Sequence, residues 1–149
     1  MKLPKELING IIIFVGITAY FLIIEILGFS FIHYLRVFNI LIVYYGVYRT
    51  LSSNVKEGKL GYLTNMLSAG ATAIIGVFLS VIGLTTFIYI KGGDRYLDSL
   101  SELFLFGGKP GVAEYCFGIL FEGIVSAVMV VFIAMQFWRN KVIIKNSLR

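Results

Sequence analysis

The chain has 149 residues, of which 58% are hydrophobic and only 14% are charged. A soluble globular domain carries roughly 25% charged and about 45–50% apolar residues, so this composition excludes an ordinary water-soluble enzyme and a disordered tail. The formal net charge is +5. Its basic residues stand between and outside long apolar runs, where they orient a membrane protein. We therefore expect the lipid bilayer as a partner, and no nucleic acid.

Four apolar segments are long enough to cross a bilayer as helices. About 20 apolar residues are needed to span the roughly 30 Å hydrocarbon core. The predicted spans lie at about 8–27, 31–48, 67–90 and 112–138. The connection between the first two is very short, so these two helices are expected to be antiparallel neighbours. The sequence thus predicts an all-α polytopic membrane protein, with one four-transmembrane-helix antiparallel bundle over residues 1–149.

The charges outside these spans predict the orientation of the chain. Three segments are rich in lysine and arginine: the N-terminus, the connection 49–65 and the C-terminus, which has no acidic residue after Trp138. Lysine and arginine near the ends of membrane helices favour the cytoplasmic side. Both termini and the connection 49–65 are therefore expected in the cytoplasm, which agrees with an even number of spans.

The outer connection 91–111 contains a further short helical pattern. Asp94 is expected to cap a helix in which apolar residues fall near one face, with Asp98 and Glu102 on another; these apolar residues are Leu97, Leu100, Leu103 and Phe104. An amphipathic helix of this kind lies on a membrane surface. A lid packed on the ends of the long helices is an equal alternative.

Small residues repeat along two of the spans. In the third span they are spaced four, three, four and three apart, and the fourth span adds two more: Ala69, Ala73, Gly76, Ser80, Gly83, Gly123 and Ala127. Membrane helices associate by close packing, which small residues permit. These positions are predicted to form the helix-packing face within one bundle, and a dimerisation seam is the alternative.

Polar residues also occur inside the spans, toward their outer halves. We predict an intramembrane polar cluster of Glu25, His33, Arg36, Asn39, Glu122 and Ser126. Charged groups in membranes usually face other helices and find a partner. An ion-pair network around Arg36, with Glu122, Glu25 or both, is the specific hypothesis. Such a network either locks the helices in register or serves as an ion or proton relay or an anion-binding pocket.

The sequence contains no pattern typical of an enzyme. Cys116 and His33 are the only residues of their types, so one chain has no internal disulfide and no zinc site built of cysteine and histidine. Nucleotide-binding, metalloprotease and serine-hydrolase motifs are absent from the sequence. No catalytic residue, cofactor or metal is therefore predicted.

Two runs within the spans resemble a known family. Leu35-Arg36-Val37-Phe38-Asn39 opens the second span, and Phe121-Glu122-Gly123-Ile124-Val125-Ser126 lies in the fourth. With the small-residue third span, they resemble the domain-of-unknown-function 4199 family of small four-span bacterial proteins. The resemblance implies a bacterial inner membrane and a four-helix fold, and it implies no mechanism.

Two functions follow as expectations. The first is a structural or accessory membrane subunit that packs through its small-residue helix faces, as a homo-oligomer or within a larger membrane complex. The second is a small proton- or ion-coupled transporter or channel that uses the intramembrane cluster of glutamate and arginine.

Overall fold

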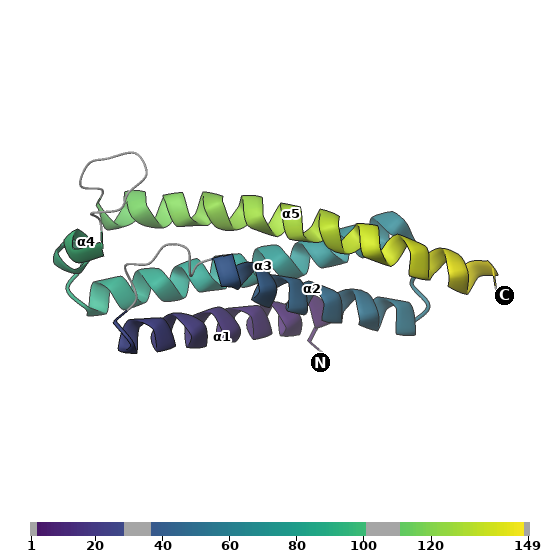
Figure 1. The fold of residues 1–149 in the computed structure, drawn as a ribbon, viewed down its shortest axis with the longest axis horizontal. Helices are drawn as coiled ribbons and strands as arrows, with labels where there is room; N and C mark the ends of the chain where they lie inside the picture. The colour runs from purple at the N-terminus through teal and green to yellow at the C-terminus, as the bar shows by residue number, and fades with distance from the viewer. Residues whose placement is uncertain (1–2, 29–36, 101–110, 148–149) are drawn as a thin grey trace.

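A computed structural model of the protein describes residues 3–28, 37–100 and 111–147, with the side chains of 98–100 and 139–147 outside the description. These residues form five helices and no strand, which confirms the all-α prediction. The helices are α1 (Lys5–Ile26), α2 (Phe38–Lys56), α3 (Tyr62–Ile90), α4 (Asp94–Leu100) and α5 (Val112–Ser147). The turn between α2 and α3 lies at one end of the molecule with the C-terminus, and α4 lies at the other end (Figure 1).

Within the described residues, three helices are long and apolar enough to cross a membrane: α1, α3 and the part of α5 from Val112 to Trp138. The 29 residues of α3 give it a length of about 43 Å. Helix α2 is not among the three, because its second half carries Arg49 and a series of hydroxyl and amide side chains. The span expected at 31–48 lies partly outside the described residues, and the helix continues beyond it to Lys56.

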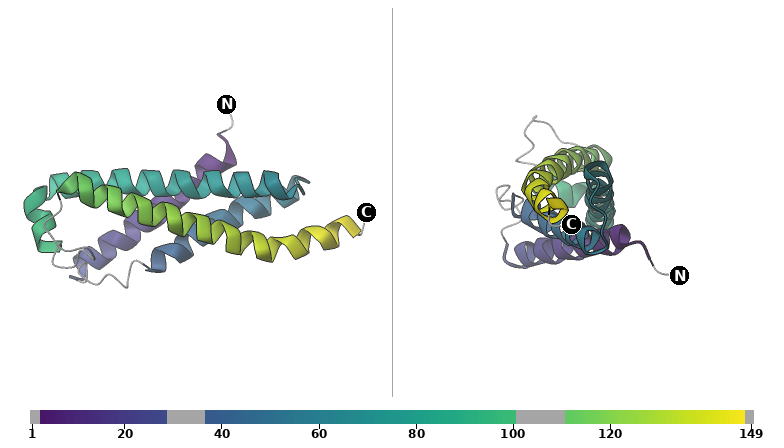
Figure 2. Two further views of the ribbon diagram at one scale, coloured as in Figure 1. Left: turned by 90° about the horizontal axis from the view of Figure 1, so that it is seen from above. Right: turned by 90° about the vertical axis from the view of Figure 1, so that its right-hand side faces the viewer.

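The centre of the fold is one side chain held between two glycines. Ile13 of α1 is fully buried. A Cβ atom at Gly76 of α3 would lie 2.6 Å from Ile13 Cγ2, and one at Gly46 of α2 would lie 2.4 Å from Ile13 Cγ1. Only glycine leaves this space, so α1 approaches both neighbours closely. Helix α1 crosses α3 obliquely (Figure 2).

The turn between α2 and α3 is fixed by backbone geometry and by one amide. Gly58 has a φ of 80°, a conformation that side-chain-bearing residues rarely adopt. Asn65 lies in the first turn of α3, and its Nδ2 donates to the carbonyl oxygens of Lys59 and Gly61, at 2.8 Å each. These bonds bring the start of α3 back onto the end of α2.

Helix α4 is a lid on the ends of the long helices. Leu97 is 1% exposed and belongs to a second core with Ile88, Val112, Tyr115 and Cys116. Of the two alternatives for this segment, packing on the other helices therefore describes its first half, 94–100. The expected residues Leu103, Phe104 and Glu102 lie outside the described residues.

The expected role of Asp94 is corrected by the structure. Asp94 is itself the first residue of α4, and its Oδ1 accepts the backbone N–H of Val112 at 3.2 Å. Val112 begins α5, so Asp94 caps the neighbouring helix. Glu114 Oε2 also accepts the N–H of Gly111 at 3.3 Å, as the third residue of a capping box does. The glycines at 92 and 93, both with positive φ, turn the chain so that Asp94 faces α5.

Candidate functional site

The predicted polar cluster is divided between different parts of the molecule. His33 and Arg36 lie outside the described residues, so the ion-pair hypothesis centred on Arg36 remains a prediction. Glu25 is half-buried near the end of α1, whereas Glu122 is exposed on α5. Helix α1 packs on α2 and α3, while α5 packs on α3 and α2. The two glutamates therefore belong to helices that are not packed on one another.

Glu25 lies beside Tyr96 of the α4 lid. Burial raises the pKa of Tyr96, and the neighbouring Glu25 carboxylate raises it further. The Tyr96 ring contacts Phe87 at 5.9 Å between centroids, and Phe87 contacts Phe21 at 5.3 Å. Glu25 Oε2 is buried, and hydrogen bonding with the Glu25 carboxylate is one of the causes of the raised pKa of Tyr96. The Glu25 carboxylate thus lies beside Tyr96, whose ring belongs to a row of three contacting aromatic side chains.

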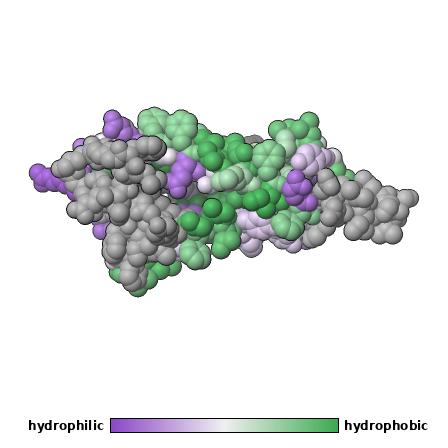
Figure 3. All heavy atoms as spheres, turned by 45° about the horizontal axis from the view of Figure 1, so that its top comes forward, coloured by the Kyte–Doolittle hydropathy of each residue, from purple (hydrophilic) through white to green (hydrophobic). Residues whose placement is uncertain are grey.

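Glu122 lies on the outward side of α5 at the level of the middle of α3. Its neighbour Gly123 faces α3, where a Cβ would lie 2.7 Å from Val77 Cγ1. Val77 is close to the centre of α3, which runs from Tyr62 to Ile90. Among the described residues, Glu122 has no hydrogen bond and no ion pair. In Figure 3, hydrophobic side chains cover the middle of the visible surface with a few hydrophilic ones among them.

Asn39 and Ser126, the two remaining residues of the predicted polar cluster, are both half-buried. Asn39, in the first turn of α2, is half-buried, and its Oδ1 has no hydrogen-bond partner in the described part of the chain. Ser126 is half-buried one turn after Glu122. Neither residue joins Glu25 to Glu122 through a hydrogen bond between described residues.

The small residues lie where the helices approach one another within one chain. Gly76 meets Ile13, Gly123 meets Val77, and a Cβ at Gly83 would lie 2.8 Å from Phe14 Cε2. Ala69, Ala73 and Ala127 are buried, and Ser80 is half-buried with its hydroxyl donating to the carbonyl of Gly76 at 2.7 Å. The helix-packing face is therefore used for contacts within one chain, and little of it is exposed for contact with a second copy.

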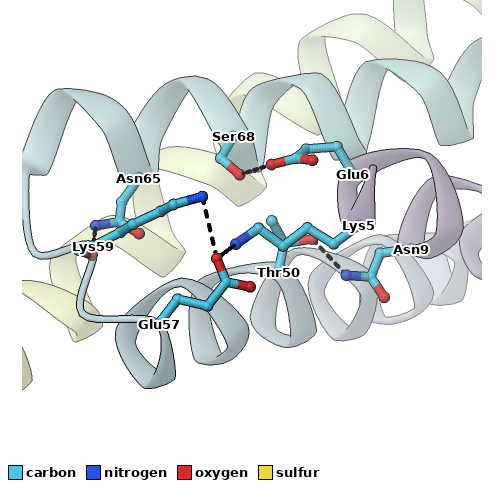
Figure 4. Close-up of polar contacts among 8 residues, drawn as sticks. All are labelled: Lys5, Glu6, Asn9, Thr50, Glu57, Lys59, Asn65 and Ser68. Carbon is cyan, nitrogen blue, oxygen red and sulfur yellow. Dashed lines mark hydrogen bonds and ion pairs between the residues drawn. The ribbon is translucent and has the colours of Figure 1, made fainter. Parts of the chain in front are cut away.

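A second polar network, which the sequence reasoning missed, joins α1, α2 and α3 near the end opposite α4. Asn9 Nδ2 donates to Thr50 Oγ1 at 2.9 Å (Figure 4), and the hydroxyls of Thr50 and Thr72 are 2.8 Å apart. All three residues are buried. Ser68 also donates to Glu6 Oε1 at 2.5 Å. The network connects the three helices through side chains whose polar atoms satisfy one another.

Charged residues close the same end of the molecule. Glu57 Oε2 lies 2.6 Å from Lys5 Nζ and 3.1 Å from Lys59 Nζ (Figure 4). Hydrogen bonds from Lys5 and Lys59 hold the pKa of Glu57 below its ordinary value, and the bond with Glu57 raises the pKa of Lys59. This pair of contacts attaches the first residue of α1 to the turn between α2 and α3.

Asn54 is the least satisfied polar side chain at this end. It is 1% exposed, and neither its Nδ2 nor its Oδ1 has a hydrogen-bond partner in the described residues. The predicted polar cluster lies in the outer halves of the spans, with Asn39 and Ser126 beside the charged residues, and it includes none of the amides and hydroxyls at this end. Asparagines and threonines near the adjoining ends of three helices, at Asn9, Thr50 and Thr72, are the signal in the sequence that could have predicted this network.

Comparisons with known proteins add no further information about this site. No protein-family model, no curated protein and no solved structure matches the chain. Within the described residues, no three histidine, cysteine, aspartate or glutamate side chains gather as the ligands of a metal ion would.

Proposed function

We propose that the chain is a four-span integral membrane protein that serves as a structural or accessory subunit of a membrane assembly. Helix α2 would be the fourth span, beginning in the segment before Phe38. Both termini and the turn between α2 and α3 would face the cytoplasm, in agreement with their basic residues. A bacterial inner membrane and membership of the domain-of-unknown-function 4199 family are part of this proposal, on the resemblance described above.

One observation carries the proposal: Glu122 is exposed on the outward face of a helix that is apolar enough to span a membrane. Its neighbour Gly123 lies at the level of Val77, near the middle of α3, so in a membrane spanned by α3 and α5 it would be near the bilayer midplane. A charged residue at the centre of a membrane helix costs about 2.5–3.5 kcal/mol on insertion scales, and such residues are normally found against protein. Glu122 has no partner among the described residues, and we propose that a second protein surface covers it.

The size of the native particle tests this function. Membranes would be extracted directly into polymer-bounded discs, and the mass of the particle that contains this chain would be measured. We expect a particle larger than the monomer, which Glu122→Leu reduces to the monomer. Phe121→Leu is the matched control, because Phe121 is the adjacent exposed residue and carries no polar group. A monomeric particle for the unaltered chain contradicts the proposal.

A second candidate, proton or ion transport, is favoured by Glu25. Its Oε2 is buried beside Tyr96, near the end of a helix that is apolar enough to span a membrane, and ionisable residues in such helices mark ion and proton pathways. We expect proton entry into vesicles, followed with a trapped pH-sensitive dye, to be lost in Glu25→Gln. Glu114→Gln, at an exposed carboxyl near the same end, should leave it unchanged. Vesicles with the unaltered chain that conduct no faster than empty ones contradict transport of protons.

A further inference from the structure

The outward face of α5 contains a regular seam. Six exposed residues, spaced four, three, four, three and four apart, define what we call the α5 seam: Gly118, Glu122, Val125, Met129, Phe132 and Gln136. Alternation of three and four is the spacing by which two helices wrap around each other. Val125, Met129 and Phe132 are each about half exposed, at 57%, 49% and 54%.

The α5 seam is separate from the side by which α5 packs in its own chain. That inner side has the same spacing at buried or half-buried positions, including Gly123, Ala127, Val130 and Ala134. Met129 lies two residues after Ala127, and two residues correspond to about 200° around a helix. Helix α5 therefore has one seam filled by α3 and α2, and a second, nearly opposite, that nothing in the described chain covers.

The polar residues of the α5 seam favour one kind of occupant. Glu122 and Gln136 occupy equivalent positions, 14 residues apart, and thus about 21 Å along the helix. A carboxamide and a protonated carboxyl each contain both a donor and an acceptor, so each is complementary to itself. In a parallel pair of identical helices, equivalent seam residues face each other. All copies of a membrane protein insert with the same orientation, so two copies meet in parallel.

We propose that this face binds a second copy of the chain, with the two α5 helices in parallel along the α5 seam. Glu122 then faces Glu122 of the partner subunit, where two carboxyl groups are placed to form hydrogen bonds with each other across the contact. Gln136 faces the equivalent amide of the partner. Gly118 permits close approach of the helices, as small residues do in membranes. The proposal specifies the partner within the accessory role proposed above and rests on it.

The first test locates the contact. The chain would be purified and reconstituted alone, at low density, in vesicles of phosphatidylcholine and phosphatidylglycerol, with Cys116→Ala removing the native thiol. We expect Val125→Cys and Met129→Cys to form disulfide-linked dimers under mild oxidation. Phe78→Cys is the control, because Phe78 is exposed on α3 at a similar level. Cross-linking of Phe78→Cys as efficient as that of Met129→Cys overturns the proposal.

The second test measures the role of the carboxyl. Dimerisation of the same reconstituted chain would be followed by energy transfer between labelled copies. Glu122→Leu is expected to weaken it about tenfold, the size of effect that interhelical hydrogen bonds have in model membrane peptides. Glu122→Gln, which stays self-complementary, and Phe121→Leu should both remain within about threefold of the unaltered chain. An unchanged dimer in Glu122→Leu overturns the proposal.

A loss of dimerisation can be distinguished from a loss of folding and from failure of the accessory role. Trp138 is the only tryptophan, is 7% exposed and lies 5.6 Å from the Tyr48 ring, so its fluorescence reports whether each variant is folded. If the purified chain alone stays monomeric while native membranes yield a larger particle with another protein, the second-copy inference fails and the accessory role stands. If native particles are monomeric, the accessory role fails instead.

Discussion

At the scale of single residues, the buried hydrogen bonds among Asn9, Thr50 and Thr72 stand out. The three residues belong to three different helices. Their hydrogen bonds therefore fix how α1, α2 and α3 are rotated relative to one another. Thr50 Oγ1 accepts from Asn9 Nδ2 and can donate its own proton to Thr72 Oγ1 or to the carbonyl oxygen of Gly46, 3.3 Å away, so its hydroxyl is the centre of the network. Removing the central hydroxyl leaves the outer two groups without this partner.

Replacement of Thr50 by valine should therefore destabilise the fold. The side-chain shape is retained, but Asn9 Nδ2 and Thr72 Oγ1 lose a partner in a buried place. We expect a loss of about 1–2 kcal/mol in the free energy of unfolding. Equilibrium unfolding in mixed micelles measures it. Thr86→Val is the control, since the exposed Thr86 hydroxyl donates only to Ile82 of its own helix, and a change above about 0.5 kcal/mol there would contradict the argument.

The ion pairs of Glu57 predict a dependence of stability on pH. The pKa of Glu57 is lower in the folded chain than its ordinary value of 4.5, so its contribution to stability is complete above that value. The contribution is lost as the pH falls through the lowered folded pKa. The pKa of Lys59 is raised, so its contribution is present below its ordinary value of 10.5 and is lost as the pH rises through the folded pKa.

Glu57→Gln tests this on the acidic side. At neutral pH the variant should be less stable than the unaltered chain, and the difference should close as the pH falls below 4.5 toward the folded pKa. The effect is small, because these side chains are accessible to solvent. Thermal unfolding in detergent, measured across the acidic range, follows it. A difference that persists at the acidic limit would assign the effect to packing of the side chain instead.

At the scale of elements, the glycines of α3 differ in what they permit. Gly76 faces Ile13, whereas nothing lies within 4 Å of a Cβ at Gly70 on the same helix. One glycine is therefore required by packing against α1, and the other is not. Both glycines belong to the same apolar helix, so composition does not distinguish them. The rotation of α3 does, because it turns Gly76 toward α1 and Gly70 away from any neighbour.

Gly76→Ala and Gly70→Ala form a matched pair. At Gly76, the new methyl would meet Ile13 at 2.6 Å, so the core must shift, and we expect a loss of about 1–3 kcal/mol. At Gly70, the same change should be neutral or stabilising by up to about 1 kcal/mol, because alanine favours helix. Unfolding in mixed micelles measures both. Equal effects of the two substitutions would contradict the close packing of α1 on α3.

At the scale of the whole molecule, the charge distribution predicts its orientation. Lys56 and Arg95 are exposed near opposite ends of the molecule. In a Cys116→Ala background, we expect Lys56→Cys to react only with membrane-permeant thiol reagents in intact spheroplasts. Arg95→Cys should react with impermeant reagents as well. Labelling of Lys56→Cys from outside would reverse the proposed topology, and labelling of both from one side would remove one of the proposed spans.

Much of the fold follows from the sequence, because helix formation and membrane affinity depend on composition along short stretches of chain. The apolar runs predicted α1, α3 and α5 closely, and the second run predicted a helix whose end lies farther along, at Lys56. The short helix at Asp94 was also predicted, but the residue that Asp94 caps was not. A cap on another helix depends on how two connections fold back together, which no local pattern contains.

The sequence by itself determined that this chain forms apolar helices with basic ends and that a few polar residues lie among them. Only the tertiary structure decided which way those residues face: Glu122 outward, Glu25 toward Tyr96, and Asn9 toward Thr50. The physical reason is that an apolar helix has little amphipathic asymmetry to set its rotation. Close contacts, such as Ile13 between Gly46 and Gly76, set that rotation, and they exist only when three helices are in place.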